Sequence, residues 1–116
     1  MIVDINKLQK ILKNISDERE WDQFHSPKNL SMALSVEASE LLEIFQWLTE
    51  KESYNLSDKK KEHLEEEIGD VATYLLRICM KFDIDLEKVI LNKIDKFEKK
   101  YPVEKAKGNA KKYTEL

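Results

Sequence analysis

The stretch SPKNLSMALSVEASELLEIFQWL, residues 26–48, decides the fold class of this 116-residue chain. Ser26 can cap the free backbone N–H groups of a first helical turn, and Pro27 suits a position that needs no N–H partner. An apolar stripe at helical spacing follows, formed by Leu30, Ala33, Leu34, Leu41, Ile44, Phe45 and Leu48. These signals predict an amphipathic helix from Pro27 to about Leu48.

Three further helices are predicted on the same grounds. They run from about Asp4 to Glu18, from Asp58 to about Lys81, and from Leu86 to Lys100. Ser57 and Asp85 precede the last two as helix caps. With only two glycines and two prolines, the chain lacks the turn formers that a sandwich or barrel of short strands requires. The prediction is an all-α fold, a four-helix bundle-like arrangement with antiparallel neighbours.

The length suits one domain. Residues 1–102 are predicted to form the helical domain, which ends at Tyr101-Pro102, because the residue before a proline is disfavoured in a helix. Residues 103–116 form a basic tail, extended or partly ordered, that belongs to the same functional unit. Apolar faces that so short a chain covers only in part predict a homo-oligomer, with dimer and tetramer both open.

Charge and hydropathy limit the partners and the compartment. The net charge of −3 provides no overall field for nucleic acid or for an anionic membrane surface. No apolar run is long enough for a signal segment or a membrane span. The single cysteine, Cys79, lies in an apolar run and has no internal partner for a disulfide. A cytoplasmic protein without nucleic-acid or membrane partners is expected.

Carboxylates interrupt the apolar faces of two predicted helices. Glu37 and Glu40, three residues apart, lie within or beside the stripe of the quoted helix, and Glu67 and Asp70 repeat the spacing on the helix that starts at Asp58. Residues three apart share one face of a helix. A partly buried carboxylate takes up a proton or binds a cation, because burying an unpaired charge is costly.

Four hard oxygen donors without a placed histidine or cysteine suit Mg²⁺, with Mn²⁺ as a possible substitute, rather than zinc. A di-iron bundle would need a glutamate three residues before a histidine, whereas Lys60 precedes His63 at that spacing. Glutamate pairs at this spacing are also common on solvated faces, and spacing alone leaves the two interpretations about equal. The apolar neighbours of Glu37 and Asp70 favour the metal site.

With their surroundings, these carboxylates resemble the ExxE…ExxD pattern of the MazG-like nucleotide pyrophosphohydrolases, and within them the small dCTP pyrophosphatase type. Glu37-Ala38-Ser39-Glu40 is followed after 26 residues by Glu67-Ile68-Gly69-Asp70. The supporting segments are REWDQFH at 19–25, PKNL at 27–30, EIFQW at 43–47, KID at 93–95, KYP at 100–102 and KYTEL at 112–116. The resemblance therefore covers nearly the whole chain from Arg19 onward.

The resemblance implies an all-α homo-oligomer that hydrolyses a (deoxy)nucleoside triphosphate, dCTP or a modified pyrimidine dNTP, to the monophosphate and pyrophosphate. A metal-activated water would attack the α-phosphate. The implied catalytic metal ligands are Glu37, Glu40, Glu67 and Asp70, with Glu37 or Glu40 as the candidate base. The implied substrate contacts are Trp21, His25, Asn29, Trp47, Tyr74, Lys93 and Asp95.

Simpler explanations stand beside these roles. Trp47 and Tyr74 would give the same pattern as core aromatics, and His25 could lie in the loop before Ser26 without contacting substrate. The lysine-rich tail could be a solvated segment. For the whole chain, the alternative is a non-catalytic helical interaction module on the same scaffold, which the intact acidic cluster disfavours. Preference for dUTP, dTTP or oxidised and methylated bases stays open.

Overall fold

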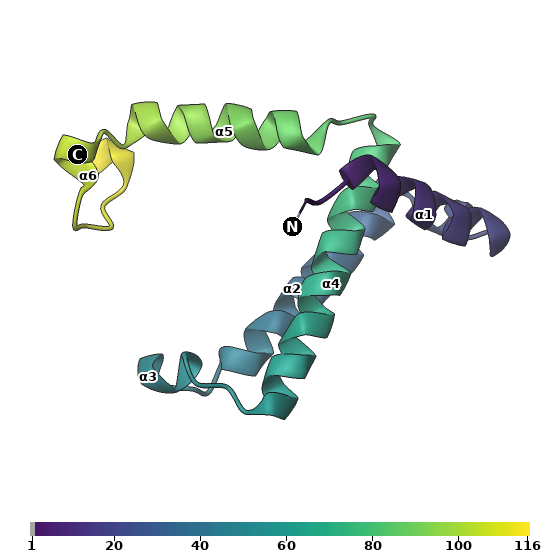
Figure 1. Ribbon diagram of the computed structural model, residues 1–116, viewed down its shortest axis with the longest axis horizontal. Helices are drawn as coiled ribbons and strands as arrows, with labels where there is room; N and C mark the ends of the chain where they lie inside the picture. The colour runs from purple at the N-terminus through teal and green to yellow at the C-terminus, as the bar shows by residue number, and fades with distance from the viewer. Residues whose placement is uncertain (1) are drawn as a thin grey trace. The chain divides into compact units, whose positions relative to one another are not determined.

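The computed structural model describes residues 2–116, and every regular element among them is helical (Figure 1). In chain order these are α1 (Ile5–Glu18), the 3₁₀ helix η1 (Asp22–Phe24), α2 (Pro27–Phe45), α3 (Glu50–Ser53), α4 (Asp58–Lys81), α5 (Leu86–Lys100), α6 (Val103–Ala106) and the 3₁₀ helix η2 (Tyr113–Glu115). The prediction of an all-α fold is confirmed. The chain divides into two compact units, one up to Asp83 and the other Ile84–Leu116, and each is described by itself.

The predicted helix caps are present. The Ser26 hydroxyl accepts a hydrogen bond from the Asn29 backbone N–H at 3.1 Å, which starts α2. The Ser57 hydroxyl accepts from the Lys60 backbone N–H at the start of α4, and a carboxylate oxygen of Asp85 accepts from the Lys88 backbone N–H at the start of α5. Each cap satisfies an N–H group that has no partner within its helix and is worth about 1 kcal/mol.

The predicted end of the second helix at Leu48 is wrong, because α2 ends at Phe45 and a new helix begins after Thr49. The Thr49 hydroxyl accepts from the Glu52 N–H at 3.1 Å, while the Glu52 carboxylate accepts from the Thr49 N–H at 2.9 Å. This reciprocal capping box starts α3. Trp47 consequently lies in the turn between the two helices, and its side chain is exposed.

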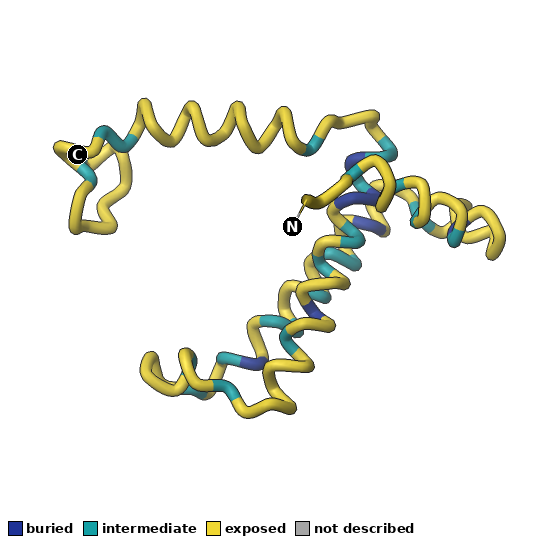
Figure 2. The backbone as a smooth tube through the Cα atoms, in the orientation of Figure 1, coloured by how far each residue is buried: buried dark blue, intermediate teal, exposed yellow. Residues whose placement is uncertain are grey.

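In the first unit, α2 and α4 run side by side and antiparallel, and α1 packs against α4 (Figure 1). The buried apolar side chains are Leu30, Ile44, Leu76 and Cys79, and burial concentrates along the α2–α4 pair (Figure 2). Cys79 is a free thiol, as predicted, and burial raises its pKa. Leu30, only 1% exposed, is the most completely enclosed of these side chains.

In the second unit, α5 carries large apolar side chains that are exposed in this chain, namely Val89, Ile90, Leu91, Ile94 and Phe97. The segment after α5 is partly ordered: the Tyr113 ring lies edge-on to Tyr101 with centroids 6.3 Å apart, and the Lys100 ammonium lies 4.6 Å from the centre of the Tyr113 ring. Across residues 2–116, no helix combines the length and the apolar character needed to cross a membrane.

Candidate metal centre

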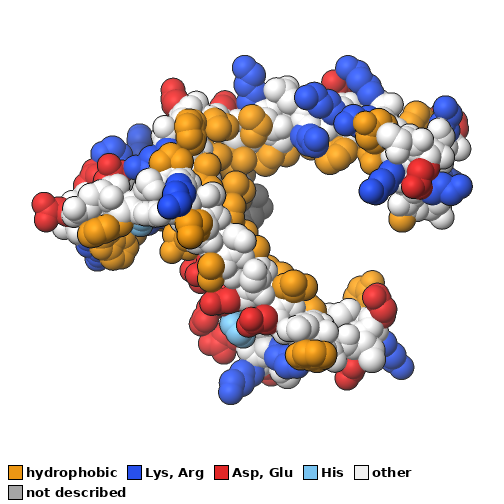
Figure 3. Space-filling view, turned by 180° about the vertical axis from the view of Figure 1, so that it is seen from behind, with side chains coloured by type: hydrophobic (Ala, Val, Ile, Leu, Met, Phe, Trp, Pro, Cys, Tyr) orange, Lys and Arg blue, Asp and Glu red, His pale blue; other side chains and the backbone are white. Residues whose placement is uncertain are grey.

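Three of the four predicted carboxylates meet where α2 packs on α4. Glu37 comes from α2, and Glu67 and Asp70 come from one face of α4. One carboxylate oxygen from each lies within 4.8 Å of the others. In Figure 3, acidic side chains gather beside a histidine over this part of the molecule. The i, i+3 spacing on α4 and the close packing of α2 together produce the convergence.

Two buried carboxylate oxygens of this cluster are left without a hydrogen-bond partner in the described part of the chain. Glu67 is only 5% exposed, and one oxygen of Glu67 and one of Glu37 are enclosed without a hydrogen-bond partner among the described residues. Buried polar atoms are almost always satisfied, so two orphaned acceptors within a cluster of three carboxylates suit a cation as their partner. Hard carboxylate oxygens fit Mg²⁺ or Mn²⁺. The residues present therefore fit the metal that the family implies.

The electrostatics of the cluster are equally unusual. The pKa of Glu37 is raised to about 7, first by hydrogen bonding to the Glu67 carboxyl and then by burial. Hydrogen bonding to Glu40 adds to this rise, as do the negative charges of Glu40 and Asp70. Like charges held together favour the protonated acid, so the cluster holds a proton near neutral pH when no cation is bound. Glu40 thus lies next to Glu37 but outside the group of three.

His63 is a neighbour of the cluster to which the sequence assigned no role. Its Nε2 lies 3.2 Å from Oε1 of Glu67, one helical turn further along α4. His63 also lines a cavity of about 330 Å³ together with Trp47 and Lys60. The i, i+4 spacing of His63 and Glu67 was readable in the sequence, but the spacing alone did not indicate that the two side chains pair.

The residues expected near the nucleotide at Arg19–Asn29 lie around η1. His25 is partly buried and lines a separate cavity, while Trp21 contacts it edge-on with ring centroids 6.0 Å apart. Burial, followed by the positive charges of Arg77 and Lys81, lowers the pKa of His25. The imidazole is therefore kept neutral at pH 7.

Asn29 has a structural task in this chain. Its side-chain amide donates to the Phe24 backbone carbonyl at 3.0 Å and so ties η1 to the start of α2. Tyr74 is half-buried on α4, one turn after Asp70, on the face that carries the cluster. Trp47 and His25 line different cavities of the same unit, so one chain does not bring these two predicted contacts together.

Lys93 and Asp95 belong to the second unit, on α5. The Lys93 ammonium lies 5.4 Å from the centre of the Phe97 ring, and Asp95 forms an ion pair with Lys99 at 2.9 Å. Both side chains are exposed. Their predicted contacts with the nucleotide stay predictions.

Comparison with known proteins agrees with this architecture. Residues 32–116 match the MazG-like family. The chain is 36% identical over 114 residues to dCTP pyrophosphatase 1 of Rattus norvegicus and of Homo sapiens, which covers 97% of this chain and 67% of each relative. The crystal structure of a pyrophosphatase from Archaeoglobus fulgidus superposes with a TM-score of 0.81 at 39% identity, covering 88% of this chain and 95% of that one.

The chain therefore belongs to the MazG-like family. Within that family it is of the dCTP pyrophosphatase type, so the resemblance read from the ExxE…ExxD pattern is confirmed.

Proposed function

We propose that this chain is a Mg²⁺-dependent pyrophosphohydrolase that converts dCTP, or a modified pyrimidine dNTP, to the monophosphate and pyrophosphate. The class, a nucleotide diphosphatase hydrolase, follows from its family and from its identity to the dCTP pyrophosphatases. The observation that carries the proposal is the convergence of Glu37, Glu67 and Asp70 with two orphaned buried oxygens.

Each carboxylate has a task in this proposal. Glu37, Glu67 and Asp70 would hold Mg²⁺, which would neutralise phosphate charge and lower the pKa of a water molecule at the site. Glu40, beside Glu37 but outside the tight group, accepts the proton of the attacking water. The water oxygen forms a bond to the α-phosphorus, the bond to the bridging oxygen breaks, and pyrophosphate leaves.

The proposal includes a homo-oligomer whose catalytic domain spans residues 1–102, with residues 103–116 in the same functional unit. Exposed apolar side chains on α5, namely Val89, Ile90, Leu91, Ile94 and Phe97, support association. Trp47 and His25 line different cavities in one chain, which also favours a site completed by a second copy. Light scattering coupled to size exclusion would give a multiple of 13.7 kDa if this is right, and 13.7 kDa if it is wrong.

The function is tested by measuring pyrophosphate release from a panel of NTPs and dNTPs with Mg²⁺. Wild type is expected to favour one base, and Asp70→Asn to lose at least about 100-fold in kcat/KM. Glu40→Gln should lower kcat while leaving the Mg²⁺ affinity unchanged, which separates a base from a ligand. Glu66→Gln removes an exposed charge from the same helix and serves as the matched control.

Two results would contradict the proposal. If wild type releases no pyrophosphate with Mg²⁺ or Mn²⁺, the chain is a non-catalytic interaction module. If activity survives both Asp70→Asn and Glu40→Gln, the enzyme stands but the assignment of the carboxylates falls.

A further inference from the structure

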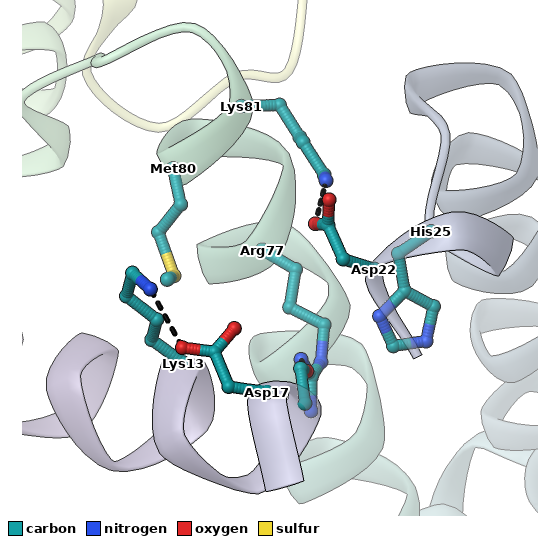
Figure 4. A pocket seen from close by; sticks show the side chains of 8 residues that line it. Lys13, Asp17, Asp22, His25, Arg77, Met80 and Lys81 are labelled. Carbon is teal, nitrogen blue, oxygen red and sulfur yellow. Dashed lines mark hydrogen bonds and ion pairs between the residues drawn. The ribbon is translucent and has the colours of Figure 1, made fainter. Parts of the chain in front are cut away.

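A second built cavity lies in the first unit, between α1, the η1 segment and the end of α4 (Figure 4). Its volume is about 300 Å³, and side chains from all three elements line it. Arg77 enters it from α4 (Figure 4), and its guanidinium ends at the hydroxyl of Ser16 on α1. Arg77 is only 9% exposed, which is unusual for a guanidinium group.

The charges of this cavity do not balance. Lys13 pairs with Asp17 at 2.6 Å, and Lys81 pairs with Asp22. Both carboxylates are thereby neutralised, and Arg77 has no ion-pair partner among residues 2–116. The guanidinium donates a hydrogen bond to the neutral hydroxyl of Ser16. A guanidinium carries five N–H donors, so most of these remain free to meet a ligand that offers acceptors.

The register of α4 relates this cavity to the carboxylate cluster. Arg77 follows Asp70 by seven residues, which is two turns of one helix face and about 10 Å along the axis. Tyr74 lies between them on the same face. A nucleotide with its phosphates at the cluster has its sugar and base displaced from the α-phosphate, so a base directed along this face reaches the level of Arg77.

Resting on the proposed function, we propose that Arg77 is the residue that selects cytosine, by donating two hydrogen bonds from its guanidinium fork to N3 and O2 of the base. These two adjacent atoms are both acceptors in cytosine. In uracil and thymine the atom between the two carbonyls is an N–H donor, which would face the donors of Arg77. A guanidinium has no acceptor with which to adapt, so it discriminates between these bases.

The neighbours of Arg77 suit this role. Ser16 holds one side of the guanidinium and acts as a positioning residue. His25, whose pKa is lowered by burial and by the adjacent cations, adds no further positive charge. The paired lysines leave Arg77 as the single uncompensated charge within the lining of this cavity.

The first test compares kcat/KM for dCTP and dUTP, which differ on this edge of the base. Wild type should prefer dCTP, and Arg77→Met should reduce the dCTP/dUTP ratio by about 10- to 100-fold, mainly through dCTP. Arg77→Lys, which keeps the charge but loses the fork, should also lose most of the preference. Ser16→Ala should reduce the ratio less, and Lys61→Met, which removes an exposed cation of α4 outside this cavity, should leave it unchanged.

The second test uses binding without turnover. Calorimetry with dCMP and dUMP, which carry the same phosphate, should show tighter binding of dCMP in wild type and equal binding in Arg77→Lys. This result would support the inference even if the wild type hydrolyses no triphosphate, so the two proposals fail separately. Circular dichroism of each variant establishes that it is folded.

Three results would overturn the inference. The wild type could bind and hydrolyse the two bases equally. The ratio could stay unchanged in folded Arg77 variants. Both nucleotides could weaken to the same extent in Arg77→Lys and Arg77→Met, with inorganic pyrophosphate competing for the same site, which would make Arg77 a phosphate contact.

Discussion

Binding of Mg²⁺ to the cluster should expel a proton from Glu37. A carboxylate must be deprotonated to bind a metal ion, and the pKa of Glu37 is raised to about 7 in the metal-free protein. The number of protons released per Mg²⁺ should therefore be about 0.9 at pH 6, about 0.5 at pH 7 and about 0.1 at pH 8. An ordinary exposed glutamate would release almost none over this range.

Calorimetry measures this number directly. Mg²⁺ is titrated into the protein at one pH in two buffers of different ionisation enthalpy, and the slope of the observed heat against that enthalpy counts the protons. The apparent Kd should weaken about tenfold for each pH unit below pH 6 and level off above pH 8. Glu66→Gln should behave as wild type, and His63→Gln should retain the release, since the proton comes from the carboxyl.

A flat Kd between pH 6 and pH 8 with no buffer-dependent heat would refute this reasoning. It would mean that Glu37 is already ionised without metal, so that the neighbouring carboxylates do not repel it as their spacing indicates. Release that disappears in His63→Gln would assign the proton to the imidazole instead, and Glu37 would lose its part in the coupling.

Three further predictions concern stability. Because the pKa of Glu37 is raised from 4.5 to about 7 in the metal-free fold, its contribution to stability is fully present below pH 4.5 and is lost as the pH rises through about 7. Relative to Glu37→Gln, the Tm of wild type should therefore fall between these pH values, so that the variant is the more stable protein by pH 8. A Tm difference that does not change with pH would contradict this. Leu30→Ala should lower the free energy of unfolding, measured in urea, by about 2–5 kcal/mol, whereas Met32→Ala at an exposed position should lower it by about 0.5 kcal/mol or less. Equal losses would mean that the α2–α4 contact is not the core. Ser57→Ala should cost about 1 kcal/mol through the lost cap, and an unchanged unfolding midpoint would show that α4 starts without it.

Much of the fold was readable from local rules. Ser26, Ser57 and Asp85 cap helices because their side chains satisfy the N–H three residues later, which depends on no distant contact. The end of α2 was misplaced because the apolar stripe continues to Leu48, whereas the Thr49–Glu52 capping box starts a new helix. The capping box could have been recognised from the sequence, but the prediction followed only the spacing of the apolar residues.

The site was only half readable for a different reason. The i, i+3 spacing placed Glu67 and Asp70 on one face of α4, but which oxygen of Glu37 approaches them depends on how α2 packs, and spacing does not specify packing. Arg77 was missed altogether. It lies within the apolar run from Tyr74 to Met80, where a single charged residue is expected to be exposed to solvent. Its burial depends on how α1 and the η1 segment pack against α4.

Charged side chains are buried at two places along α4, and the two places carry opposite charges. At one, two carboxylate oxygens have no hydrogen-bond partner and suit a cation, and at the other a buried guanidinium has no ion-pair partner among residues 2–116. A fold is often more stable with apolar residues at such buried positions, so charged residues that are kept there tend to serve a function. A nucleoside triphosphate has phosphates that need a metal at one end and a base edge with acceptors at the other. One nucleotide lying along a single face of α4 would thus explain both the buried carboxylates and the buried guanidinium. A metal ion at the carboxylates would not by itself explain why Arg77 is buried.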